Sequence, residues 1–248
     1  IDITNMTGSY PSGSVKPLTL FMLPFVFEDV SHMQRALQAG LLDLGMRQAL
    51  LEQHDTVVLG VAPWDPYEFY TRKNPIESVS DFAGTTWATT GETDARAIQL
   101  LGGAPTSMSS SELYLAFDRG VIDGTPRPLL TGIGRSLHEV VKHIALSNFV
   151  MDTSILAINR KTWDKLPADL QQVLMEAAAE RDRLQFAMVE DFIEEAIGRY
   201  RELGVEVRRL DAETIAKLRR TTQPAITGWL AEVENGQDVE RPNNYLAM

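Results

Sequence analysis

The hydrophobic and polar positions along the chain predict an alternation of short strands and helices. A buried strand is expected over residues 56–61, where the run TVVLGV is apolar and β-branched, and a second over 154–159, SILAIN. Apolar residues at helical spacing predict one helix over about 33–51 and another over 94–101, which Gly102 terminates together with the glycine after it. This alternation favours an α/β fold with mostly parallel sheets.

Shorter elements fill the intervals between these segments. Further short strands are predicted at 85–89, 121–124 and 204–210. Ser110 or Ser111 is expected to cap a helix that ends at Gly120. Asp211 is expected to cap a short helix, and Pro224 to open the last one, because proline suits the first helical turn.

The longest predicted element is a helix over about 168–203. Its apolar positions keep a helical period for about 35 residues, or roughly 50 Å at 1.5 Å per residue. A polar stretch at 179–183 interrupts the apolar seam, which disfavours a coiled coil. Because one compact layer rarely needs a helix of this length, we expect two lobes joined by crossing strands, with this helix running across both.

Composition and charge exclude several classes of protein. The 248 residues include 34 acidic and 23 basic side chains, a net charge of −11, and no basic stripe for a nucleic acid is present. No apolar run reaches the ~20 residues that span a bilayer. The chain has no cysteine, which removes thiol nucleophiles, disulfides and cysteine metal sites. It opens at Ile1 without a leader pattern, and we expect it to lack an N-terminal part.

Common catalytic signatures are also absent. The sequence has no P-loop, HExxH or GxSxG motif, its four histidines are scattered, and the glycines at 132 and 134 form an incomplete dinucleotide motif. No cofactor or metal is therefore expected. Four aromatics and two acids lie instead in the predicted loop 62–70, directly after a strand, where α/β proteins bind ligands. This segment either lines a pocket or is a packed loop between lobes.

Several motifs, taken in order, resemble those of the extracytoplasmic solute-binding proteins of TRAP transporters. The similarity covers most of the chain, and the spacing of the motifs makes it specific. The matching segments are LPFVF at 23–27, DFAG at 81–84, LGGAPTSM at 101–108, SELY at 111–114, GVIDG at 120–124 and RKTWDKLP at 160–167.

The resemblance implies a two-lobed periplasmic-binding-protein fold that closes over its ligand by a hinge motion. It assigns 1–66 and 153–194 to the first lobe, without the family's first strand and helix, and 67–152 and 195–248 to the second. It also implies a periplasmic protein, with its signal peptide removed, that is no enzyme. We expect a monomer that delivers a small solute to a TRAP membrane permease.

Three positions depart from the family's pattern. The family's arginine four residues after the DLKG glycine is replaced by Ala88, and a second frequent arginine falls near Tyr67. The asparagine before a proline is replaced by Arg127, in the run TPRP at 125–128. The resemblance therefore implies that the usual carboxylate clamp is missing from its normal place.

Two ligands remain open. Arg127 could supply the guanidinium from a different wall, in which case the ligand is still an organic acid. Alternatively the ligand is a small amine, amino alcohol or zwitterion, held by aromatic faces and a carboxylate. The aromatics and acids tilt our expectation slightly towards the amine. In that interpretation Trp64, Tyr67 and Trp87 supply the ring faces, with Asp65 or Asp152 as the counter-charge.

These considerations predict one cleft between the lobes. Its expected members are Trp64, Asp65, Tyr67, Trp87, Arg127 and Asp152, with Tyr10 and Ser111 at the rim. The alternative from another class is an α/β enzyme that handles a small molecule, such as a dehydrogenase or a transferase. The absence of a nucleophile, a metal set or a complete cofactor fingerprint disfavours it.

Overall fold

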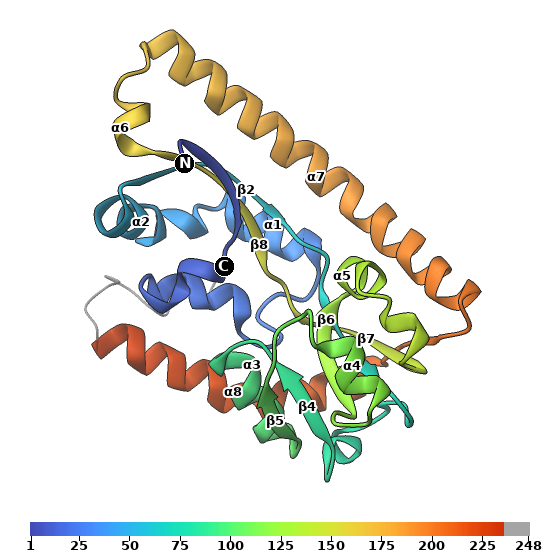
Figure 1. Cartoon of the computed structure of the whole chain (residues 1–248). Coiled ribbons are helices and arrows are strands. Elements are labelled where there is room, and N and C mark those ends of the chain that lie inside the picture. Colours follow the sequence, from blue (N-terminus) through green and yellow to red (C-terminus); the bar gives the residue numbers. More distant parts are fainter. Residues whose placement is uncertain (236–248) are drawn as a thin grey trace.

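A computed structural model describes residues 1–235, which fold into two lobes (Figure 1). The first lobe is built on an antiparallel three-stranded sheet in the order β1–β8–β2. Its strands are β1 (Ile3–Thr7), β2 (Thr56–Pro63) and β8 (Thr153–Asn159), so both strands predicted from apolar runs are confirmed. A bulge between Val58 and Gly60 shifts the register of β2 against β8.

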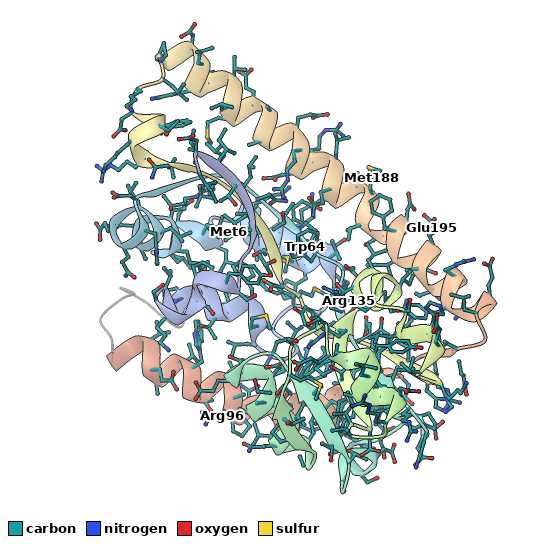
Figure 2. The ribbon with its side chains drawn as sticks, viewed as in Figure 1. Met6, Trp64, Arg96, Arg135, Met188 and Glu195 are labelled. Atoms are coloured by element: carbon teal, nitrogen blue, oxygen red, sulfur yellow. The ribbon has the colours of Figure 1, made fainter. Side chains whose placement is uncertain are left out.

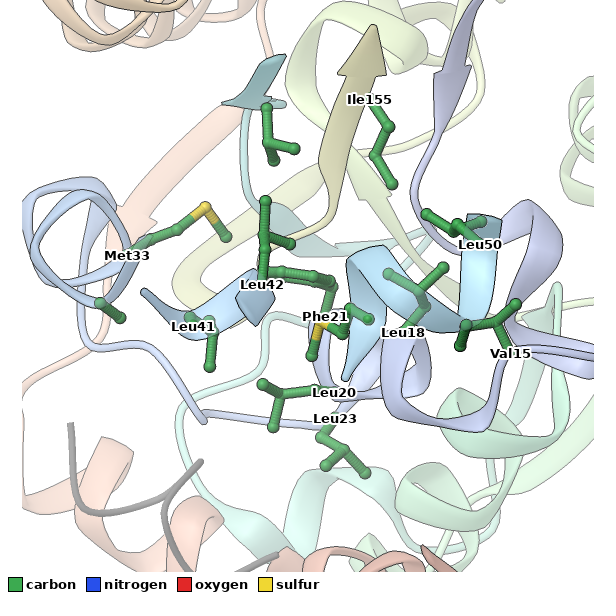
Figure 3. Close-up of a cluster of buried hydrophobic side chains, with 14 of the residues drawn as sticks. Val15, Leu18, Leu20, Phe21, Leu23, Met33, Leu41, Leu42, Leu50 and Ile155 are labelled. Carbon is green, nitrogen blue, oxygen red and sulfur yellow. The ribbon is translucent and has the colours of Figure 1, made fainter. Parts of the chain in front are cut away.

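Helices cover both faces of this sheet. One face packs against α1 (Val30–Gln38), α2 (Met46–His54) and the 3-10 helix η2 (Lys16–Met22), and Figure 3 shows the apolar side chains that fill this layer. The other face carries α6 (Arg160–Trp163) and the start of α7. The smaller 3-10 helices of this lobe are η1 (Tyr10–Gly13) and η3 (Leu41–Asp43).

The single helix predicted over 33–51 is wrong. Gly40 and Gly45 adopt φ angles of 93° and 97°, in the left-handed region that interrupts a helix. The chain therefore forms two helices separated by η3, and this break folds both helices onto the same core layer.

The second lobe is built on a six-stranded mixed sheet in the order β5–β4–β6–β3–β7–β9. Strand β3 is antiparallel to both β6 and β7, whereas the other neighbouring pairs are parallel, so the expectation of mostly parallel sheets is only partly met. The strands are β3 (Tyr67–Thr71), β4 (Thr86–Thr89), β5 (Ala104–Ser107), β6 (Gly124–Pro128), β7 (His143–Val150) and β9 (Glu206–Arg209). Much of the segment 62–70 is thus strand rather than loop.

Short helices surround this sheet. They are η4 (Val79–Phe82), α3 (Glu92–Leu101), α4 (Leu113–Asp118), α5 (Leu129–Gly134) and η5 (Leu137–Glu139). The predicted end of α3 is confirmed, because Gly102 has a φ of 97°. The predicted serine cap of α4 is wrong. Glu112 precedes that helix, and its carboxylate accepts a hydrogen bond from the backbone N–H of Ser109.

The two lobes are joined by two strand crossings and by the long helix. Residues 64–66 link β2 to β3, and residues 151–152 link β7 to β8, within the crossing segment predicted at 148–154. Helix α7 (Ala168–Glu202) packs on β2 in the first lobe and on α5 and β9 in the second. Figure 1 shows it along the whole outer side of the molecule, so its predicted contact with both lobes is confirmed.

The last helix, α8 (Ala212–Asn235), also packs against both lobes. Pro224 lies inside it and does not open a new helix, so that prediction is wrong. Leu218 belongs to a core cluster of the second lobe, whereas Ile226 and Trp229 pack into the core of the first. Burial on both sides of the proline holds the helix together across it.

The domain division therefore stays a proposal with one change. We propose that the second half of α8 belongs structurally to the first lobe, although 195–248 was assigned to the second. Residues 236–248 of that assignment lie outside the described residues. No helix in the described part of the chain is long and apolar enough to cross a bilayer.

Candidate functional site

A cavity of about 740 Å³ opens between the two lobes. The N-terminal segment of the first lobe forms one wall, and the first turn of α3 and the junction of β6 and α5 form the other. Figure 2 shows Trp64 and Arg135 where the lobes meet, with Arg96 beside α8. The polar and aromatic lining residues are Thr7, Ser9, Tyr10, Ser12, Lys16, Thr19, Trp64, Asp65, Tyr67, Thr90, Glu92, Thr93, Asp94, Arg96, Ser110, Arg127, Thr131, Arg135, Trp229 and Glu232.

Arg127 is the innermost cation of this cavity. Its side chain is only 2% exposed, and its Nη1 donates to the carbonyl oxygen of Pro126 at 2.7 Å. Among the residues that the structure describes, Nε and Nη2 have no hydrogen-bond partner. Burial lowers the pKa of this guanidinium, because no carboxylate is paired with it. The free Nε–Nη2 edge is the fork that binds a carboxylate in bidentate fashion.

Asp94 lies in the same cavity wall but is already satisfied. One of its carboxylate oxygens accepts from the N–H groups of Gly91 and Ala95, and the other from the N–H and hydroxyl of Thr90. It therefore closes the N-terminus of α3, a position where a carboxylate is favoured. Arg127 gains only a longer-range attraction from it.

Asp65 also serves the backbone. Its Oδ2 accepts from the N–H of Leu130 at 2.9 Å, at the start of α5. Pro128, the residue that precedes this helix, offers no side-chain cap, so Asp65 supplies one from the crossing segment. Burial raises the pKa of this carboxyl. An ammonium ligand would have to compete with the helix for it.

Asp152 lies behind the cavity, and the lining residue Ser9 separates the two. Its carboxylate accepts from the Ser9 hydroxyl at 2.6 Å, from the Ser9 N–H at 3.2 Å and from the Thr153 N–H at 2.7 Å. Burial raises its pKa to about 6. This carboxylate ties the N-terminal segment to the second crossing, and we no longer place it in contact with a ligand.

Trp87 must be removed from the expected site. Its indole is fully buried, stacks on Phe82 at 4.9 Å and meets the edge of Phe69 at 5.6 Å. Its Nε1 donates to the hydroxyl of Thr85 at 2.7 Å. Because strand side chains alternate in direction, Trp87 points into the core of the second lobe.

The remaining expected residues divide as follows. The structure brings Tyr10, Trp64, Asp65, Tyr67 and Arg127 to one cavity, and Trp64 keeps 37% of its surface exposed there. Ser111 is exposed and bonds to Ser109, and its neighbour Ser110 lines the cavity instead.

Sequence reasoning missed the residues that begin α3. Thr90, Glu92, Thr93 and Asp94 line the cavity directly after β4. The principle that drew attention to segment 62–70, that ligands gather beyond the carboxyl ends of strands, applies equally here. Hydroxyls of the N-terminal segment, such as Ser12 and Thr19, carried no comparable signal. In the described part of the chain, no group of histidines and acids is placed to hold a metal ion.

Comparison with known proteins agrees with the two-lobed fold and its central cavity. The family described as bacterial extracellular solute-binding protein, family 7 (DctP), matches residues 1–232. The chain belongs to this family, which confirms the resemblance to TRAP solute-binding proteins. The alternative of an α/β enzyme is set aside, because the family consists of solute-binding proteins.

Two curated relatives are periplasmic proteins, and so is this one. The C4-dicarboxylate-binding periplasmic protein DctP of Rhodobacter capsulatus is 28% identical over 215 residues, covering 85% of this chain and 63% of the relative. The sialic acid-binding periplasmic protein SiaP of Vibrio cholerae is 26% identical over 193 residues, covering 77% and 60%. The chain thus spans 60–63% of the length of these relatives.

The fold is shared with solved structures. A TRAP periplasmic solute-binding protein from Chromohalobacter salexigens, solved with bound D-glucuronate, superposes with a TM-score of 0.88 at 20% identity. The match covers 100% of this chain and 79% of that one. The predicted two-lobed α/β class with a long helix is therefore confirmed.

Proposed function

We propose that the protein captures a small organic acid in the inter-lobe cavity and delivers it to a TRAP membrane permease. The single observation that carries the proposal is Arg127, a buried cation whose Nε and Nη2 are free on one edge and border the cavity. An unpaired buried charge is costly, and a carboxylate that binds both nitrogens removes that cost. The arginine that the family pattern lacks at Ala88 is thus replaced from the neighbouring strand.

The alternative, a small amine, finds less support in the cavity. Asp65 caps α5, Asp152 is tied to Ser9, and Asp94 closes α3, so each buried carboxylate nearby already has backbone partners. The names of the relatives and of the solved structure all point to acids, namely C4-dicarboxylate, sialic acid and D-glucuronate. We therefore favour the acid that Arg127 can hold.

The rest of the cavity suits a hydroxylated ligand body. Hydroxyls of Thr7, Ser12, Thr19 and Thr131 line it, beside the partly exposed indole of Trp64. Sugar rings present hydroxyls at their edges and C–H groups on their faces, which match hydroxyl and aromatic walls respectively. We propose a hydroxylated monocarboxylate, such as a sugar acid, as the ligand class. The cavity is complete within one chain, and we propose a monomer that closes about the crossing segments.

A thermal-shift and calorimetry series tests the proposal. The probes are sodium D-glucuronate, its neutral amide D-glucuronamide, succinate and ethanolamine. We expect stabilisation by the carboxylates alone, reaching about 2.7 kcal/mol at 100 times the dissociation constant, with no turnover of any probe. Stabilisation by ethanolamine but by no carboxylate would restore the amine, and equal binding of D-glucuronate and its amide would remove Arg127 from the site.

Tyr67 should contribute a second polar contact. Its hydroxyl makes no hydrogen bond within the described residues, and burial, with help from Asp152, raises its pKa. We expect Tyr67→Phe to weaken D-glucuronate binding about 3- to 10-fold, the worth of one hydrogen bond, without lowering the melting temperature. Calorimetry on the variant measures the first effect and thermal unfolding the second. Unchanged affinity would mean that the hydroxyl faces only water.

A further inference from the structure

The three residues that follow Arg127 are each held by a side chain from a different element. The carbonyl of Pro128 accepts from the Tyr70 hydroxyl at 3.3 Å, and that of Leu129 accepts from the Tyr200 hydroxyl at 3.0 Å. The N–H of Leu130 donates to Asp65 at 2.9 Å. The holding groups come from β3, from α7 and from the first crossing segment, so regions far apart in sequence converge on one short stretch of backbone.

The two phenols form a closed chain of hydrogen bonds. Tyr70 and Tyr200 are fully buried, their oxygens are 3.0 Å apart, and each phenol has one proton to donate. Since Tyr200 donates to Leu129, Tyr70 is the donor between them and shares its proton with the carbonyl of Pro128. Gly132 makes room for this pair, because a Cβ there would collide with both phenol oxygens. The unexplained glycine motif at 132–134 therefore has a packing reason at its first position.

Helix α7 connects this network to the other lobe. Near its middle, Asp182 accepts from the N–H of Val61 at 2.7 Å, and Gln185 donates to the carbonyl of Pro63. Both contacts lie at the end of β2, directly before the crossing segment that carries Asp65. Tyr200, near the other end of the same helix, holds the backbone next to Arg127.

We propose that Tyr200, supported by Tyr70 and Asp65, is a positioning residue that aims the free edge of Arg127 into the cavity. The inference rests on the proposed function, since it assumes that this edge binds a carboxylate. Pro126 and Pro128 lock φ on either side of Arg127. The remaining freedom lies in the peptides at 128–130, and those are the groups that the three side chains hold. Arg127 needs this external support because its only hydrogen-bond partner is the carbonyl of the preceding residue.

The test observes the Arg127 Nε–H group directly by ¹⁵N NMR of the full chain. Arg127→Lys assigns the signal by its disappearance. Sodium acetate is the carboxylate probe, and acetamide is its neutral match. In Tyr200→Phe, which keeps the ring and removes only the hydroxyl, we expect the Nε–H proton to exchange with water about 10-fold faster and acetate to bind about 3- to 10-fold more weakly.

Tyr114→Phe is the matched control. The Tyr114 hydroxyl bonds to Glu139 at 2.7 Å on α4, away from Arg127, and its loss should leave both readings unchanged. If Tyr200→Phe does not fold, Tyr70→Phe removes one bond of the same chain and should shift both readings in the same direction. A lower melting temperature with unchanged Arg127 exchange and acetate affinity would overturn the inference and leave only a structural role. Failure of acetate to perturb the Arg127 signal in the unaltered protein would instead overturn the proposed function.

Discussion

Arg127→Met is expected to weaken D-glucuronate binding by at least about 30-fold and to stabilise the ligand-free protein. The binding loss follows because truncating one partner of a buried charge pair typically costs ~2–5 kcal/mol. The gain in stability follows because Nε and Nη2 are desolvated without a partner in the described structure. Methionine fills similar space without a charge, and such replacements of buried ions stabilise by roughly 1–3 kcal/mol.

Calorimetry and thermal unfolding of the ligand-free variant measure the two effects separately. Arg127→Lys is the matched control, because it keeps the charge but loses the bidentate fork. It should bind D-glucuronate with an affinity between that of the unaltered protein and that of Arg127→Met. A less stable Arg127→Met that still binds the acid would show that the arginine is a structural group and not the carboxylate site.

Glu68→Gln is expected to flatten the pH dependence of stability between about pH 6.5 and 8.5. Glu68 is 2% exposed, on β3 directly after the first crossing. Its Oε2 accepts from the N–H groups of Ser147 and Asn148 and from the Ser147 hydroxyl. Burial raises its pKa from 4.5 to about 8, against the opposing effects of these bonds and of Arg209.

The sign follows from proton binding. Between pH 4.5 and 8 the folded chain keeps a proton on Glu68 that the unfolded chain has lost, so the free energy of unfolding falls as the pH rises. Asp152, with a pKa near 6, acts in the same direction but only below the tested window. Glutamine keeps an acceptor oxygen and cannot ionise. We expect it to exceed the unaltered protein in stability at pH 8.5 by roughly 1–3 kcal/mol.

Urea unfolding at pH 6.5, 7.5 and 8.5 provides the measurement. Glu195→Gln, on the exposed face of α7 (Figure 2), is the matched control and should leave the pH profile as it is. A profile of Glu68→Gln parallel to that of the unaltered protein would show that Glu68 is ionised throughout this range.

Local sequence patterns predicted elements whose cause is local. The apolar run at 56–61 and the helical period over 168–203 each reflect one continuous buried face. Predictions failed where a distant contact overrode the local signal. Pro224 should open a helix, but burial of Leu218 on one side and Trp229 on the other keeps α8 continuous.

The candidate site shows the same division. The strand-end rule led to Trp64, Asp65 and Tyr67, and the departures from the family pattern led to Arg127, all of which line the cavity. The same reasoning included Trp87, because the sequence does not show which face of β4 is buried. It also took Asp65 and Asp152 as free counter-charges, although both are committed to backbone groups.

The sequence by itself determined the family, the two-lobed architecture and the identity of the unusual arginine, because these depend on motif order, on helix length and on residue type. Only the tertiary structure decided which charges are free. Whether Asp65 is available depends on Leu130, whether Asp152 is available depends on Ser9, and the aim of Arg127 depends on Tyr200. Each of these partners is more than sixty residues away along the chain, and a hydrogen bond forms only when folding brings its two atoms to about 3 Å.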